Sequence, residues 1–230
     1  MSSLDKQQKN RLAHMMQNGV PLEPRPYEAI AGQLGFDEQQ IIDQVRTWLE
    51  EPYLREISAI LEGSAFGYDS ALVAGKAPED DIERVAEIIN RHPTVTHNYR
   101  REHDYNLWFT VATPPHMDLE ETLEILAKQT DVDRYYPLRR THTFKIGVNF
   151  DLEDRKNTTE VVELAAPEVR RPSDRQKAMY RALQTPLAAE PEPFDRLAEQ
   201  VGVSVDELLS FAQDELGDSI RRYVATFKHR

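Results

Sequence analysis

A pattern of prolines, glycine and apolar residues occurs twice in this chain, once near each end. In both copies a proline-rich connection precedes a short apolar segment that ends at glycine, Gly35 in the first copy and Gly202 in the second. The next segment opens at Asp37 or Ser204, residue types that favour the N-terminus of a helix. Two helices joined in this way are typical of a helix-turn-helix unit. The repeat therefore predicts two small units of the same fold.

Each copy is followed by a segment with the composition of a strand, residues 54–61 after the first and 220–227 after the second. A strand in this position forms a wing. We therefore expect two winged helix-turn-helix units, at residues 1–63 and 174–230. The second unit is expected to be incomplete, because no second sheet-forming region follows it here.

The region between the copies has a different pattern, in which strands and helices alternate. Strands are predicted at 68–77, 94–99, 105–113 and 141–150, helices at 78–91 and 118–129, and an irregular edge piece at 132–140. This β-α-β-β-α-β order predicts a ferredoxin-like domain at residues 64–151, with both helices on one sheet face. Residues 152–173 contain few large apolar side chains and are predicted to be a linker. The fold class is α+β.

Charge and composition exclude several classes of function. The chain has 28 Lys and Arg against 40 Asp and Glu, a formal net charge of 28 − 40 = −12, which disfavours general affinity for nucleic acid or anionic membranes. It has no cysteine, so disulfides and thiolate metal sites are excluded. Neither a leader sequence nor a membrane-length apolar run is present, so we expect a cytoplasmic protein.

A winged helix followed by a ferredoxin-like sheet is the domain order of Lrp/AsnC transcriptional regulators. The expected recognition helix at 37–51 carries one arginine against five acids, and its counterpart at 204–218 carries no basic residue. Phosphate contacts are made chiefly by Lys and Arg, so DNA binding is disfavoured. The basic residues near the second wing leave the regulator open as an alternative: Arg221, Arg222, Lys228 and Arg230.

Residues 97–109 bring together side chains suited to a planar, polyanionic ligand. His97 and His103 can exchange protons near neutral pH. Arg100 and Arg101 lie between them, and arginine binds carboxylates through two parallel hydrogen bonds. Aromatic rings that could stack on a flat ligand complete the segment: Tyr99, Tyr105 and Trp108. In a strand starting at Tyr105, the odd-numbered residues are expected in the core and Trp108 on the open sheet face.

Three motifs carry a resemblance to a known family. They consist of His97 to Tyr99 with Arg101, His103 and Tyr105 to Thr110; Phe66 to Tyr68 with Ser70 and Leu72 to Ala74; and Phe144 to Val148 with Phe150 and Asp151. These residues resemble the siroheme decarboxylases, which are Lrp/AsnC-like proteins of alternative haem and haem d1 biosynthesis. The resemblance covers residues 5–151, and the second winged unit resembles the start of the family's sister subunit.

The resemblance implies loss of carbon dioxide from two acetate groups of siroheme, giving didecarboxysiroheme without an added cofactor. His103, and secondarily His97, are then the candidate proton donors. Arg100 and Arg101 are expected to hold carboxylates that stay on the macrocycle, with Tyr99, Tyr105, Trp108 and Lys145 as further substrate contacts. Members of the family pair two complete units, as separate or fused subunits, which implies a sister subunit. Open sheet faces and edges of the ferredoxin-like type commonly pair across a two-fold axis, so a homodimer or a hetero-oligomer is expected.

Alternative roles for the same residues stay open at this point. His97 or His103 could ligate the iron of a bound tetrapyrrole, which would make the protein a tetrapyrrole sensor. No resident metal site is expected. Arg100 and Arg101 could be turn residues that pair with Glu102 and Asp104, and Lys145 an ordinary strand-edge lysine.

Overall fold

The computed structural model describes residues 4–51, 53–139, 144–146, 161–163 and 169–228. Most of these residues fall into two compact units. The first unit combines the residues up to Glu62 with those from Arg171 onward, and the second extends from Gly63 to the end of β5. Strands β6 (Phe144–Ile146) and β7 (Val161–Glu163) pair with each other. The described helices include none that is both long and apolar enough to cross a membrane.

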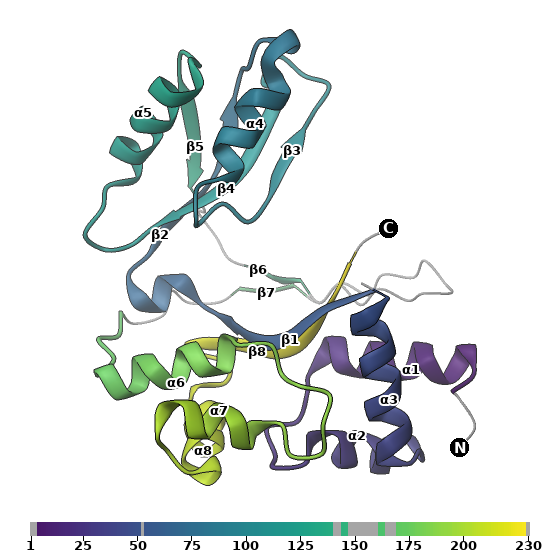
Figure 1. Ribbon diagram of the computed structural model, residues 1–230. Coiled ribbons are helices and arrows are strands. Elements are labelled where there is room, and N and C mark those ends of the chain that lie inside the picture. Colours follow the sequence, from purple (N-terminus) through teal and green to yellow (C-terminus); the bar gives the residue numbers. More distant parts are fainter. Residues whose placement is uncertain (1–3, 52, 140–143, 147–160, 164–168, 229–230) are drawn as a thin grey trace. The chain divides into compact units, whose positions relative to one another are not determined.

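The first unit contains two similar sets of three helices and a strand (Figure 1). The N-terminal set is α1 (Lys6–Asn18), α2 (Pro26–Leu34), α3 (Glu38–Glu50) and β1 (Leu54–Leu61). The C-terminal set is α6 (Asp174–Gln184), α7 (Phe194–Val201), α8 (Val205–Glu215) and β8 (Ile220–Phe227). The strands expected at 54–61 and 220–227 are thus confirmed.

Local sequence explains where these helices begin and end. The Ser204 hydroxyl accepts a hydrogen bond from the Glu207 backbone N–H at 3.1 Å and so caps α8. Gly35 and Gly202 end α2 and α7 in the left-handed conformation, with φ of 74° and 67°, which glycine adopts without a steric penalty.

The two sets pack against each other through equivalent contacts. Strands β1 and β8 form an antiparallel two-stranded sheet, which the two sets of helices share (Figure 1). The connection after the first helix of each set donates a backbone hydrogen bond to the strand of the other set. These paired contacts are Val20 to Tyr223 and Leu187 to Ile57, both 2.8 Å. The sequence repeat therefore forms a pseudo-symmetric pair within one chain.

The second unit is a four-stranded antiparallel sheet with two helices. Its elements are β2 (Asp69–Gly75), α4 (Ile82–Asn90), β3 (Asn98–Arg100), β4 (Leu107–Thr113), α5 (Leu119–Thr130) and β5 (Tyr135–Arg139), with short 3₁₀ turns η1 (Gly63–Phe66) and η2 (Glu79–Asp81). The strand order is β3-β4-β2-β5, which gives the expected ferredoxin-like domain.

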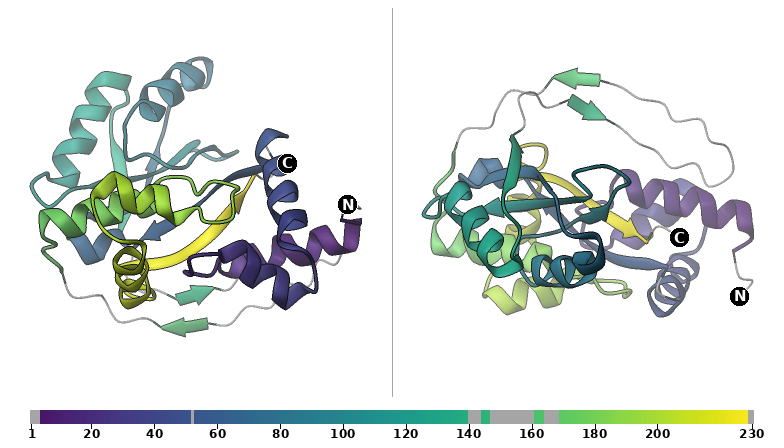
Figure 2. Two further views of the ribbon diagram at one scale, coloured as in Figure 1. Left: turned by 60° about the horizontal axis from the view of Figure 1, so that its bottom comes forward. Right: turned by 90° about the horizontal axis from the view of Figure 1, so that it is seen from above.

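Both helices cover the same face of this sheet (Figures 1 and 2). Alternation along β4 sends Leu107, Phe109 and Val111 into the core beneath them, where each is at most 1% exposed. They pack with apolar residues of α4 and α5, among them Val85, Ile89, Leu123 and Leu126. The odd-numbered β4 residues are therefore core, as expected.

The edge piece expected at 132–140 is confirmed as β5, the edge strand of this sheet. Three other details of the predicted domain are wrong. The predicted strand 141–150 does not join this sheet, because β6 within it pairs with β7. The first hairpin strand is only Asn98–Arg100, because the backbone turns before it, with the Val95 N–H donating to the His92 carbonyl at 3.1 Å. Tyr105 is 36% exposed and not core, because β4 begins two residues later.

Candidate functional site

The sheet face away from the helices is largely apolar and uncovered within the second unit. Leu72, Tyr136 and Leu138 are 39%, 40% and 48% exposed there. The strand register places one residue from each strand in a single row across this face, in the order Tyr99, Trp108, Ala74 and Tyr136. We call these four residues the aromatic row. The expectation that Trp108 lies opposite the core agrees with this register.

His97 lies beside one end of the aromatic row. Its carbonyl accepts a hydrogen bond from the Thr110 backbone N–H at 3.0 Å, which extends the pairing of β3 with β4. Its ring centroid is 5.9 Å from that of Tyr99, and its Nδ1 is 3.0 Å from the Thr96 hydroxyl. The imidazole is thus held against an aromatic ring, next to the open face.

The two adjacent arginines of the hairpin have different surroundings. The Arg100 guanidinium donates to the carboxylate of Glu79 in η2. The Arg101 guanidinium instead lies over the ring of Tyr99, 5.1 Å from its centroid. Among the described residues no carboxylate forms an ion pair with Arg101. The suggested turn pairing of these arginines with Glu102 and Asp104 is absent from the described contacts, and Arg101 is the one placed at the aromatic row.

His103 lies in the loop between β3 and β4. Its Nδ1 accepts a hydrogen bond from the Tyr105 backbone N–H at 3.1 Å, so in the neutral ring the proton is on Nε2. The rings of His103 and Tyr105 are nearly parallel, with centroids 6.2 Å apart. Two open depressions of about 330 and 380 Å³ adjoin His103, and both are also lined by Arg101 and Glu102. Its Nε2 is therefore the nitrogen able to donate to a ligand.

Asn106 anchors the base of this loop and was missed in the sequence. Its side chain is 7% exposed and exchanges two hydrogen bonds of 2.9 Å with the backbone of Ala77. It also donates to the Glu79 carboxylate at 3.1 Å. Asn106 and Glu79 together connect the loop to the start of α4.

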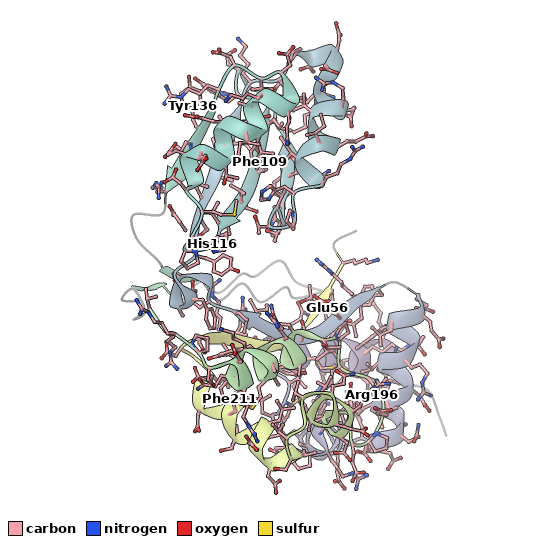
Figure 3. The ribbon with its side chains drawn as sticks, turned by 60° about the vertical axis from the view of Figure 1, so that its left-hand side comes forward. Glu56, Phe109, His116, Tyr136, Arg196 and Phe211 are labelled. Atoms are coloured by element: carbon pink, nitrogen blue, oxygen red, sulfur yellow. The ribbon has the colours of Figure 1, made fainter. Side chains whose placement is uncertain are left out.

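The far end of the aromatic row, on β5, was also missed. Tyr136 contacts Tyr105 edge to face at 5.4 Å, and the Tyr136 hydroxyl raises the pKa of Tyr105. Arg134 lies over the Tyr136 ring at 5.2 Å. Tyr135 is buried and Tyr136 is exposed, so two consecutive tyrosines of β5 lie on opposite sheet faces. Two consecutive aromatic residues in a possible edge strand were the signal available in the sequence. Figure 3 labels Tyr136 and the core residue Phe109.

Two other expectations concern a lysine and metal ions. Lys145 belongs to β6, but its side chain lies outside the described part of the structure. Within the described residues no group of three or more His, Asp or Glu side chains could hold a metal ion.

The fold and the site define an AsnC-like protein with an N-terminal helix-turn-helix unit. A family model described as AsnC-like ligand binding domain matches residues 65–145. A second, described as siroheme decarboxylase NirDL-like HTH domain, matches residues 9–55.

Individual relatives narrow this class to one family. The siroheme decarboxylase of Hydrogenobacter thermophilus is 32% identical over 96% of this chain and 66% of its own length. The siroheme decarboxylase alpha subunit of Desulfovibrio desulfuricans is 37% identical over 67% of this chain and 86% of its own length. The chain belongs to the siroheme decarboxylase family.

A solved structure agrees with this assignment. The crystal structure of siroheme decarboxylase NirDL in complex with an iron-uroporphyrin III analogue matches with a TM-score of 0.73 and 26% identity. The match covers 95% of this chain and 65% of that protein. The chain thus spans slightly less than two thirds of the length of this structure and of the Hydrogenobacter relative.

Proposed function

We propose that this chain is a siroheme decarboxylase, which removes two acetate carboxyl groups from siroheme as carbon dioxide. The observation that carries the proposal is the open sheet face, where the aromatic row lies beside His97, His103 and Arg101 in a member of this family. Flat rings suit the face of a macrocycle, and arginine suits the carboxylates at its rim.

The reaction needs proton transfer and no net oxidation. In each step the bond between the acetate methylene and its carboxyl carbon breaks, and carbon dioxide leaves. One proton replaces it, so that the acetate becomes a methyl group. The bonding electrons are accepted by the pyrrole once a proton has been placed on it, so a well-placed proton donor lowers the barrier. The iron belongs to the substrate.

His103 is our first candidate for this donor and His97 the second. The Nδ1 of His103 is occupied by the Tyr105 backbone N–H, which directs its Nε2 to a ligand. His97 adjoins the aromatic row through Tyr99. Either ring could also ligate the substrate iron.

The other candidate residues are assigned different roles because their surroundings differ. Arg101 is proposed to hold a carboxylate that stays on the macrocycle, because a cation fixed on the departing group would stabilise the ground state. Arg100 is proposed to position the loop through Glu79. Tyr99 and Trp108 form the stacking surface, with Tyr105 at its edge. A substrate contact for Lys145 stays a prediction.

Residues 174–230 are proposed to form a second winged helix-turn-helix unit, since α6, α7, α8 and β8 repeat the N-terminal set. The domain limits at 63, 151 and 173 stay predictions, as does the cytoplasmic location. Relatives named as subunits support a proposal that the chain assembles with a second copy or a sister subunit.

The regulator alternative has less support. The exposed residues of α8 include Asp206, Glu207 and Asp214. The single basic residue of α3, Arg46, donates to the Ala189 carbonyl at 3.1 Å. Strands β1 and β8 also pair with each other. An acidic helix and a paired wing are poorly suited to DNA phosphates.

Anaerobic incubation of the protein with siroheme tests the proposal. We expect release of carbon dioxide and a product lighter by two molecules of it. His103→Ala should reduce turnover at least about a hundredfold, the lower range for loss of a general acid. His14→Ala, on the exposed side of α1, serves as the matched control. A visible spectral shift with unchanged siroheme would instead favour a sensor.

A further inference from the structure

We propose that Arg134 and Tyr136 form a second carboxylate-binding pair, opposite Arg101 and Tyr99, and that a planar polycarboxylate macrocycle spans the two. This inference rests on the proposed function, because it places the same ligand. It adds two residues at the start of β5 that the sequence did not point to, and it assigns the ligand's orientation on the sheet.

The two pairs have similar guanidinium-to-ring distances and lie at opposite edges of the sheet. Directly after β3, the Arg101 guanidinium lies 5.1 Å from the centre of the Tyr99 ring. Beside β5 the Arg134 guanidinium lies 5.2 Å from the centre of the Tyr136 ring. Both tyrosines belong to the aromatic row, which crosses all four strands. The two guanidinium groups therefore bracket the row.

The spacing of strands gives the distance across the sheet between the two arginine–tyrosine pairs. Neighbouring strands lie about 4.8 Å apart, so the three intervals from β3 to β5 span roughly 14 Å. A tetrapyrrole with acid groups around its rim is of this order of size. Between the two ends, Trp108 offers an aromatic surface. Ala74, paired with Trp108, has a small side chain that does not project far from the sheet.

The charges also fit such a ligand. Among the described residues, neither Arg101 nor Arg134 forms an ion pair with a carboxylate. Arg139, at the other end of β5, pairs with both Asp69 and Glu120. In a chain with a net charge of −12, two arginines that have no ion pair within the described structure and lie beside an apolar surface suit an anionic ligand.

Stacking on tyrosine prepares each arginine for binding. A guanidinium that lies over a ring face can still donate N–H groups to the two oxygens of a carboxylate. Because the side chain is already partly ordered, less conformational entropy is lost when the ligand binds. Carboxylates at opposite rims of one macrocycle would engage both pairs at once.

The test measures binding to the full chain without turnover. Two iron porphyrins serve as probes, one with eight rim carboxylates and one with two, followed by visible absorbance and tryptophan emission. Arg134→Gln should weaken binding of the eight-carboxylate probe about tenfold to a hundredfold, the range of one lost charge-assisted contact. Binding of the two-carboxylate probe should change less than about threefold, because few of its orientations use Arg134.

Arg139→Gln is the matched control, since it removes the same charge from the other end of β5, on the helix side. It should bind both probes like the parent protein. Arg134→Lys should recover only part of the loss, because lysine keeps the charge without the planar two-pronged geometry. Tyr136→Leu should also weaken binding, because it removes the ring that holds Arg134.

Three results would overturn the inference: an unchanged affinity in Arg134→Gln, an equal loss in Arg139→Gln, or no binding of the eight-carboxylate probe by the parent protein. Failure of the proposed function would look different. The parent protein would then bind the probe through Arg134 but return siroheme unchanged.

Discussion

Asn106 shows how a single buried side chain organises the loop that carries His103. Its side-chain oxygen accepts from the Ala77 N–H, and its side-chain nitrogen donates to the Ala77 carbonyl. Without Asn106 these two backbone groups would be buried without hydrogen bonds. Nothing in the local pattern distinguishes Asn106 from a surface residue, because its partners are 29 positions away in the chain. Its role could not be predicted from the sequence.

Replacing Asn106 with alanine should lower the free energy of unfolding by about 2 to 4 kcal/mol, since two backbone groups lose their partners. Urea denaturation measures this. Asn18→Ala, at an exposed position near the end of α1, should stay within about 0.5 kcal/mol. Equal stabilities of the two variants would contradict the role assigned to Asn106.

The ion pair of Arg100 with Glu79 leads to the opposite expectation for stability. Both side chains are more than half exposed, at 56% and 64%. Exposed pairs contribute little, so Glu79→Gln should change the free energy of unfolding by less than about 1 kcal/mol. Its turnover of siroheme should nevertheless fall, because the loop carrying His103 loses one of its connections. Turnover equal to that of the parent protein would contradict the proposed role of Glu79 and Arg100 in positioning the loop.

At the residue scale, the sequence predicted the kinds of side chain better than their directions. His97, Tyr99 and Trp108 do adjoin one sheet face, and Phe109 lies in the core on the other. Arg100 and Arg101 were expected to act together because they are neighbours, yet β3 ends between them and they have different partners. Their separation depends on where the strand ends, which composition alone does not fix.

At the scale of elements, β5 confirms the edge piece expected at 132–140, although the sequence there looked irregular. Pro137 fits in this strand because proline is tolerated at a sheet edge, where its missing N–H faces no partner. Tyr135 then fixes the register. It packs on Phe109 at 5.2 Å and its hydroxyl lies 2.9 Å from that of Thr130. These long-range contacts outweigh the weak local preference.

The fit of β5 against β2 depends on Gly75. A methyl group at this position would overlap the ring of Tyr135. Gly75→Ala should therefore destabilise the protein by about 1 to 3 kcal/mol, as expected for overpacking. Gly32→Ala, in α2 with open space around it, should be neutral or stabilising by up to about 1 kcal/mol. Thermal unfolding distinguishes them, and a Gly75→Ala protein as stable as Gly32→Ala would show that Tyr135 moves freely.

At the scale of the whole molecule, the repeat was visible in the sequence but its pairing was not. The shared prolines and glycines predicted two units of one fold. That the two strands would pair with each other requires contacts such as Val20 with Tyr223, which join opposite ends of the chain. No local pattern encodes such a contact.

Charge gives a prediction at the same scale. With a net charge of −12 and with α3 and α8 both acidic, the protein should not retard random duplex DNA in a gel, even at about 50 mM salt, where phosphate contacts are strong. Polyglutamate, a polyanion that competes with DNA for basic surfaces, should not change the migration of the DNA when it is added to the mixture. Retardation of a specific fragment that survives competitor DNA would support the regulator instead.

The most direct measurement is the mass of the tetrapyrrole recovered after anaerobic incubation with siroheme in deuterated water. The account predicts loss of two molecules of carbon dioxide, with one deuteron gained at each new methyl group and no oxidant consumed. Siroheme recovered intact, or decarboxylated only when an oxidant is added, would contradict it.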